Sequence, residues 1–260
     1  DFANITFNNT TSGTSPSIVF GSNASGTMAP ADISISSTAT FTDGVVAVNS
    51  ATFGEDATAV SGSTDTGKGM GLNSHIVGDV TKEVADGTTV SDFTFPVGSG
   101  STYGGITADL SGDATVGYNF NQSGYSTNDM PRWWSLGASS EFNNVNNREF
   151  WEIDGTLTDA TITWAGGDRQ NEDSPWDNDA LGVAFWDGTH WVNLNGSSTT
   201  ADGTGVSGSI GPIGSIGSTG FLTLGSTNPN IVLPIELVSL TATCENSSAV
   251  LRWTTATETN

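Results

Sequence analysis

Apolar residues occupy every second position in short runs along most of this chain, as at residues 106–110, 114–120 and 160–164. Such alternation places one side of a strand against a core and the other side in water. Gly, Asn, Asp and Ser separate the runs, and no segment of helical length shows a helical apolar period. The pattern predicts an all-β protein, with an antiparallel β-sandwich of jelly-roll or Ig-like type over residues 86–228.

The most distinctive part of this region is residues 148–194, which hold five of the eight tryptophans. An Asp-Gly pair at residues 187–188 lies between the apolar runs 181–186 and 191–194, which predicts a tight hairpin. The alternation places large aromatic residues on a buried face. It predicts core positions for Trp151, Trp164, Trp186 and Trp191.

Residues 1–85 form a separate strand-rich region in this prediction, with short apolar runs at irregular spacing. Coils of a β-solenoid and a meander of small sandwich strands both fit that spacing. Farther along the chain, Ile210, Ile213 and Ile216 recur at a three-residue step within a Gly-rich stretch. Three isoleucines are too few to make a repeat fold, so residues 203–219 are predicted to be a Gly-rich loop that leads into a strand at residues 220–224.

Residues 229–260 are predicted to form a C-terminal β-hairpin extension, after a linker rich in Ser, Asn and Pro. One strand has an apolar face at Val238, Leu240, Ala242 and Cys244, and the next at Ala249, Leu251, Trp253 and Thr255. An isolated hairpin is marginal in water. The extension therefore either joins the sheet of a neighbouring copy, with Val238, Leu240, Ala242, Leu251 and Trp253 as subunit contacts, or folds back onto its own sandwich.

The chain is strongly acidic, with 6 Lys and Arg against 28 Asp and Glu, a formal net charge of −22. Such a surface repels phosphate backbones and anionic bilayers, so we expect no nucleic-acid partner and no membrane insertion. No stretch approaches the roughly 20 apolar residues of a membrane helix. The one cysteine, Cys244, excludes an intramolecular disulfide and is predicted to be a small buried residue.

Motifs for catalysis are weak. His75 and His190 have no partner at zinc-ligand spacing, and no nucleophile elbow or phosphate loop is present. Glycosidases use a pair of carboxylates, and four carboxylates cluster in sequence near aromatic residues: Glu141, Glu149, Glu152 and Asp154. Acidic strands contain such neighbours without catalysis, so we expect no enzyme activity and no cofactor.

The acidic stretch 167–179 is the best candidate for a cation, because calcium takes several oxygen ligands from a flexible loop. Its carboxylates include Asp168, Asp173, Asp177 and Asp179, although their spacing is not that of a known calcium loop. A solvated hairpin connection explains the same residues. Calcium therefore stays a secondary prediction.

Several motifs occur in a distinctive order: FTFPVGSGSTYGGI, REFWEIDG, TITW, VAFWDGTHWVNL, FLTLGS and LPIELVSLTATCENSSAVLRWTTATETN. The chain resembles large secreted and cell-surface proteins of Bacteroidetes that are exported by the type IX secretion system, including gliding-type adhesins. The resemblance implies an extracellular or surface-attached adhesive or structural protein without catalysis. In that group the C-terminal motif opens a fibronectin-like domain.

These observations favour an extracellular subunit of a surface fibre or layer that associates with copies of itself as a homopolymer. The C-terminal strands, together with the N-terminal strand, are the expected contacts. The alternative function is a carbohydrate-binding module that contacts surface glycans, with Trp133, Trp134 and Trp176 as the ligand platform.

Overall fold

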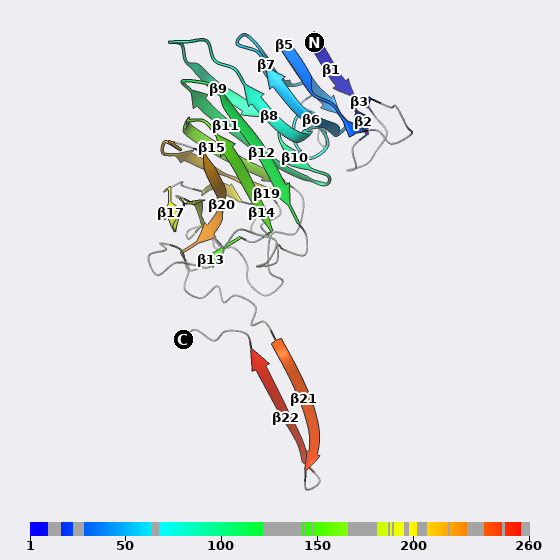
Figure 1. The fold of residues 1–260 in the computed structure, drawn as a ribbon, viewed down its shortest axis with the longest axis vertical. Coiled ribbons are helices and arrows are strands. Elements are labelled where there is room, and N and C mark those ends of the chain that lie inside the picture. The colour runs from blue at the N-terminus through cyan, green and yellow to red at the C-terminus, as the bar shows by residue number, and fades with distance from the viewer. Residues whose placement is uncertain are drawn as a thin grey trace.

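The structure is a computed structural model in which the described residues are 1–9, 17–22, 29–63, 68–121, 142, 144–146, 148–165, 181–186, 188, 190–194, 198–201, 207–217, 219–227, 237–245 and 248–255. All regular elements among these residues are β-strands, which confirms the all-β class (Figure 1). No described segment forms a helix that is long and apolar enough to cross a membrane.

Twelve of the described strands form one mixed sheet, named here the large sheet. Its order is β1 (Phe2–Asn8), β5 (Ile33–Asp43), β6 (Val46–Phe53), β8 (Ile76–Lys82), β12 (Ala114–Phe120), β14 (Glu149–Asp154), β20 (Gly220–Ser226), β16 (Leu181–Trp186) and β17 (Trp191–Asn193). Beside this path β2 (Ile18–Val19) pairs with β6, β7 (Thr58–Ser61) with β5, and β13 (Asn144–Val145) with β20.

The second layer, named the small sheet, has six described strands. They are β10 (Gly98–Ser99), β11 (Thr102–Leu110), β15 (Leu157–Ala165), β19 (Ser207–Ile213) and β18 (Ser198–Ala201) in that order, with β9 (Val90–Phe95) paired to β11. Two further pairs stand as sheets of their own, β3 (Gly21–Ser22) with β4 (Ala29–Pro30) and β21 (Leu237–Glu245) with β22 (Ser248–Thr255).

The N-terminal strands of the large sheet pair in parallel, whereas the short pair β3 and β4 outside it is antiparallel. β1 lies parallel to β5, β5 to β6 and β7, and β6 to β2 and β8. Consecutive strands of a meander would be antiparallel. Of the two arrangements that fit the sequence of residues 1–85, the structure therefore has the stacked parallel coils of a solenoid-like region.

These coils continue into the sandwich without a break in the large sheet. One row of register partners crosses five strands: Ile33, Ala51, Val80, Val116 and Ile153. All five side chains are buried. Pairing changes from parallel to antiparallel between β8 and β12, yet the apolar face stays continuous, and one core cluster includes residues from both sides of position 85.

The small sheet covers this face with its own apolar row of Ile106, Ile162 and Ile210. The prediction of a loop over residues 203–219 was wrong, because residues 207–213 form β19. A register shift between Ala160 and Ile162 of β15 sets Ile213 opposite Ala160 and Ile210 opposite Ile162. The shift brings two isoleucines that are three residues apart onto one buried face.

The prediction of core positions is confirmed for three of the four tryptophans. Trp151, Trp164 and Trp191 are fully buried, and Trp186 packs at the edge of a second small cluster. The predicted hairpin is present, with β16 and β17 antiparallel and Trp186 opposite Trp191. Their rings meet edge to face at 5.4 Å between centroids, an arrangement that aromatic pairs prefer.

We predict that Gly98→Ala destabilises the fold by about 1–3 kcal/mol, the usual cost of forcing an extra group into a packed core. A Cβ at position 98 would overlap the His75 ring and the carbonyl oxygen of Thr102. Gly112→Ala is the matched control, because a Cβ there meets nothing within 4 Å. Urea denaturation midpoints measure both changes, and an equal midpoint for the two variants would contradict this view of the packing.

Candidate functional site

The C-terminal hairpin has the register that its sequence predicts. Leu240 lies opposite Trp253, Ala242 opposite Leu251, and Cys244 opposite Ala249. Directly opposed residues of an antiparallel pair belong to the same face of the sheet. One face therefore holds the six apolar residues of these three pairs, while the other face holds Ser239, Thr241 and Thr243 opposite Thr254, Arg252 and Val250.

No other described strand pairs with either edge of this hairpin. In Figure 1 β21 and β22 lie apart from both sheets, at the opposite end of the molecule from β1. Among the described residues the hairpin is thus a sheet of two strands, and its strands are not part of the large or the small sheet. The contacts predicted at Val238, Leu240, Ala242, Leu251 and Trp253 all lie within it.

Two other predicted sites lie outside the described residues. They are the calcium loop with Asp168, Asp173, Asp177 and Asp179, and the ligand platform of Trp133, Trp134 and Trp176. Within the described part of the chain, no group of three or more His, Cys, Asp or Glu side chains could hold a metal ion.

The structure separates the clustered carboxylates of β14. Glu149 is fully buried on the inner face and accepts hydrogen bonds from the Tyr118 hydroxyl (2.8 Å) and from Asn146 Nδ2 (2.9 Å). Glu152 and Asp154 are exposed. Alternating strand residues point to opposite faces, so these acids do not converge as a glycosidase pair.

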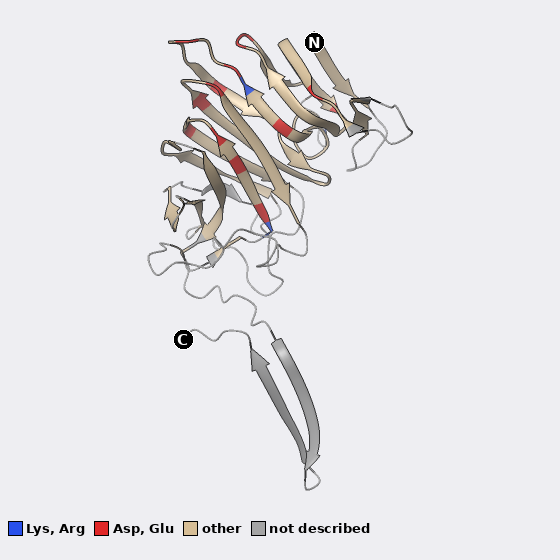
Figure 2. Ribbon diagram, viewed as in Figure 1, with Lys and Arg blue, Asp and Glu red and all other residues tan. Residues whose placement is uncertain are grey.

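On the outer face of the large sheet, Glu152 lies near Asp79, with Gly117 between them. Although Glu152 is exposed, neighbouring atoms remove part of its hydration and raise its pKa, and the negative charge of Asp79 raises it further. A hydrogen bond from Asn119 Nδ2 to Glu152 Oε1 (3.2 Å) opposes this shift. Figure 2 shows acidic residues along β14 and near many strand ends, with few basic residues on the described ribbon.

His75 is completely buried at the start of β8. Its Nδ1 donates to the carbonyl oxygen of Gly71 at 2.9 Å, whereas Nε2 is buried and has no hydrogen-bond partner. His75 therefore satisfies only one of its two buried ring nitrogens. Burial lowers the pKa of His75, because the charged ring would lose its hydration.

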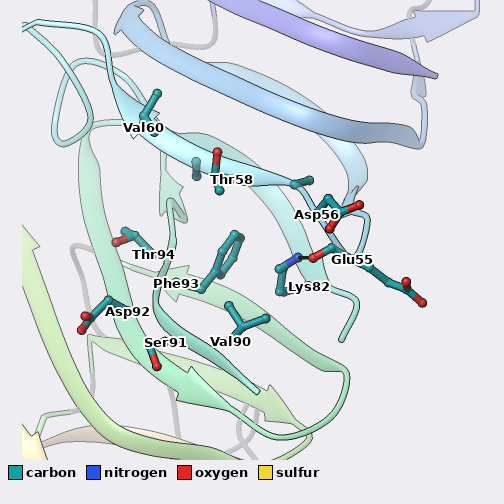
Figure 3. A pocket seen from close by; sticks show the side chains of 12 residues that line it. Glu55, Asp56, Thr58, Val60, Lys82, Val90, Ser91, Asp92, Phe93 and Thr94 are labelled. Carbon is teal, nitrogen blue, oxygen red and sulfur yellow. Dashed lines mark hydrogen bonds between the residues drawn. The ribbon is translucent and has the colours of Figure 1, made fainter. Parts of the chain in front are cut away.

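Sequence reasoning missed a cavity of about 270 Å³ between β7 and β9. Lys82 lies in its wall with only 1% of its surface exposed, and Nζ donates to the carbonyl oxygens of Gly54 (2.5 Å) and Glu55 (2.7 Å). The ring centroid of Phe93 is 5.6 Å from Nζ (Figure 3). Burial lowers the pKa of Lys82, and Asp56 is the foremost of the nearby acids that oppose this shift.

A signal for this cavity was present in the sequence. Lys82 occupies an inward position of β8, in register with Phe53 on one side and Ala114 on the other. A lysine in an otherwise apolar row is rarely buried without partners. Its partners come from the turn after β6, which no local pattern connects to β8.

No protein-family model matches this chain, and comparisons with curated proteins and with solved structures found no significant match.

We predict that folding stability falls as the pH decreases from 7 to about 5.5. The folded-state pKa of His75 is below its unfolded value of about 6.5, so the unfolded chain binds more protons in this range. The stabilising contribution of neutral His75 is fully present above pH 6.5 and is lost below it. Melting temperatures measure the effect.

His75→Gln should flatten this pH dependence, whereas His190→Gln, which removes the other histidine, should leave it unchanged. A pH dependence that persists in His75→Gln would assign the effect to the carboxylates instead.

Proposed function

We propose that this protein is an extracellular structural or adhesive subunit that associates with copies of itself through β21 and β22. The observation that carries the proposal is the hairpin: three opposed pairs of apolar residues share one face, and both edges of the hairpin lack a partner among the described strands. A two-stranded sheet with one apolar face is at best marginally stable in water. Pairing with the edge of another sheet would satisfy the edge groups, and packing against the same neighbour would bury that face.

A neighbouring copy offers a suitable edge in β1. This strand ends the large sheet, pairs only with β5 among the described strands, and carries no charged residue over its seven positions. Main-chain hydrogen bonds along such an edge give affinity without specific side chains. In a chain with net charge −22, an uncharged edge is also where two copies repel each other least.

The positions of the two elements favour a chain of subunits over a closed dimer. β1 and the hairpin lie at opposite ends of the molecule (Figure 1). Contacts between two different surfaces are head-to-tail, and they extend into filaments unless the rotation between subunits closes a ring. Such an assembly agrees with the resemblance to exported surface proteins.

The test is the double substitution Leu240→Asp with Leu251→Asp, which places two charges on the apolar face. We expect wild-type particles larger than one chain, whose mass grows with concentration, and a variant with the mass of a single chain. Burying an unpaired carboxylate in an interface costs several kcal/mol, enough to abolish association. Light scattering gives the mass and electron microscopy the morphology.

The matched control is Thr241→Asp with Thr243→Asp, which adds the same charge to the other face of β21. This control variant should still assemble, as should any variant that leaves the apolar face intact. Deletion of residues 231–260 should abolish assembly. A wild-type protein that stays a single chain at all concentrations, or equal loss of assembly in both double variants, would refute the proposal.

A further inference from the structure

The cavity between β7 and β9 lies where the parallel ladder of the N-terminal coils stops. β1, β5 and β7 form consecutive rungs of that ladder, but β9, which lies next to β7, pairs with β11 of the small sheet instead. The two strand edges therefore face each other without a ladder between them. The cavity of about 270 Å³ occupies this break.

Its lining combines apolar surface with hydrogen-bonding groups. Val60, Val90 and the Phe93 ring form apolar surface, and Figure 3 shows Phe93 between the side chains of the two strands. Hydroxyls and carboxylates surround this surface: Thr58, Ser91, Thr94, Glu55, Asp56 and Asp92. A small apolar wall with a few converging polar groups is the usual composition of a ligand site.

The backbone at Asp92 is unusual. Its φ of 53° is in the left-handed region, and two residues of β9 there oppose one residue of β11, a β-bulge. The Asp92 N–H donates to Asp109 Oδ1 at 2.9 Å, which holds the bulge in place. Left-handed conformations of non-glycine residues and bulges both concentrate at functional sites. Here the bulge sets an exposed carboxylate at the rim of the cavity.

The charges around the cavity favour a neutral ligand. Three carboxylates line it and repel anions, and the single cation, Lys82, is already bound to two backbone carbonyls. Lys82 in turn disfavours a second cation in the same small space. Neutral hydroxyl groups can donate to the carboxylates and exchange hydrogen bonds with Thr58 and Ser91.

We propose that this cavity binds one neutral sugar residue, as a free monosaccharide or as the end of a glycan. A sugar ring combines an apolar face of C–H groups with a rim of hydroxyls, which matches the lining. At about 30 Å³ for each water, the cavity has room for roughly nine waters. Bonded atoms lie closer together than separate waters, so a ligand of about ten to fifteen non-hydrogen atoms needs a comparable volume. One hexose falls within that range. This site is independent of the self-association proposed above.

The test uses saturation-transfer NMR on the full chain with the methyl glycosides of glucose, mannose and galactose and with N-acetylglucosamine, followed by titration of the best binder. Asp92→Asn keeps the size of the side chain and tolerates the left-handed backbone, but it removes the charge. We expect about tenfold weaker binding, the effect of losing one charge-assisted hydrogen bond. Thr58→Trp should abolish binding, because the indole would fill the cavity from an exposed strand position.

Two controls preserve the cavity. Asp86→Asn removes an exposed carboxylate, and Ser111→Trp adds an indole at an exposed turn, both away from the cavity lining. Both should bind like the wild type, and the melting temperature of each variant verifies folding. Absence of transfer to all four sugars, or binding that survives both Asp92→Asn and Thr58→Trp, would overturn the proposal. n-Butylammonium binding that depends on Asp92, without sugar binding, would also overturn it and indicate a cation site.

Discussion

The large sheet changes from parallel to antiparallel pairing between β8 and β12, and the rest of the fold depends on keeping one apolar face continuous across that change. The row from Ile33 to Ile153 satisfies this requirement with five buried aliphatic side chains. Because both kinds of strand present the same face, the small sheet can cover coils and sandwich together. Hydrophobic burial, the dominant favourable term in folding, is therefore shared between the two regions.

In the next row along the same strands, a charged residue interrupts the apolar face. Ile35 and Phe53 are followed by Lys82, whose ammonium group is held by carbonyls of the turn after β6. A buried cation is tolerable only when hydrogen bonds replace its lost hydration. Near Lys82, β9 pairs with β11 of the small sheet and does not continue the parallel ladder of β1, β5 and β7. The cavity lies between β7 and β9, where the two sheets are not hydrogen-bonded to each other. The proposed sugar site is thus a consequence of joining a solenoid-like stack to a sandwich.

The two proposals place adhesion and assembly on different parts of the chain. Among the described strands the hairpin joins neither the large nor the small sheet, and the proposed pairing with a copy would extend the large sheet of the next subunit at β1. The cavity lies within the body, on strands that such pairing leaves free. A repeating assembly would present the same cavity on every subunit, and multivalent display raises the avidity of sites that are individually weak.

The sequence by itself determined the strands that alternate regularly and their faces, because alternation with period two is a local property. It predicted the buried tryptophans, the Asp-Gly hairpin and the amphipathic register of the last two strands. It did not determine which strands pair, since parallel and antiparallel ladders suit the same side chains. Only the tertiary structure decided the coils of residues 1–85, the bulge that makes Ile210 and Ile213 share a face, and the contacts of His75 and Lys82. Each of these depends on groups distant in sequence, so no window along the chain contains the interaction that fixes it.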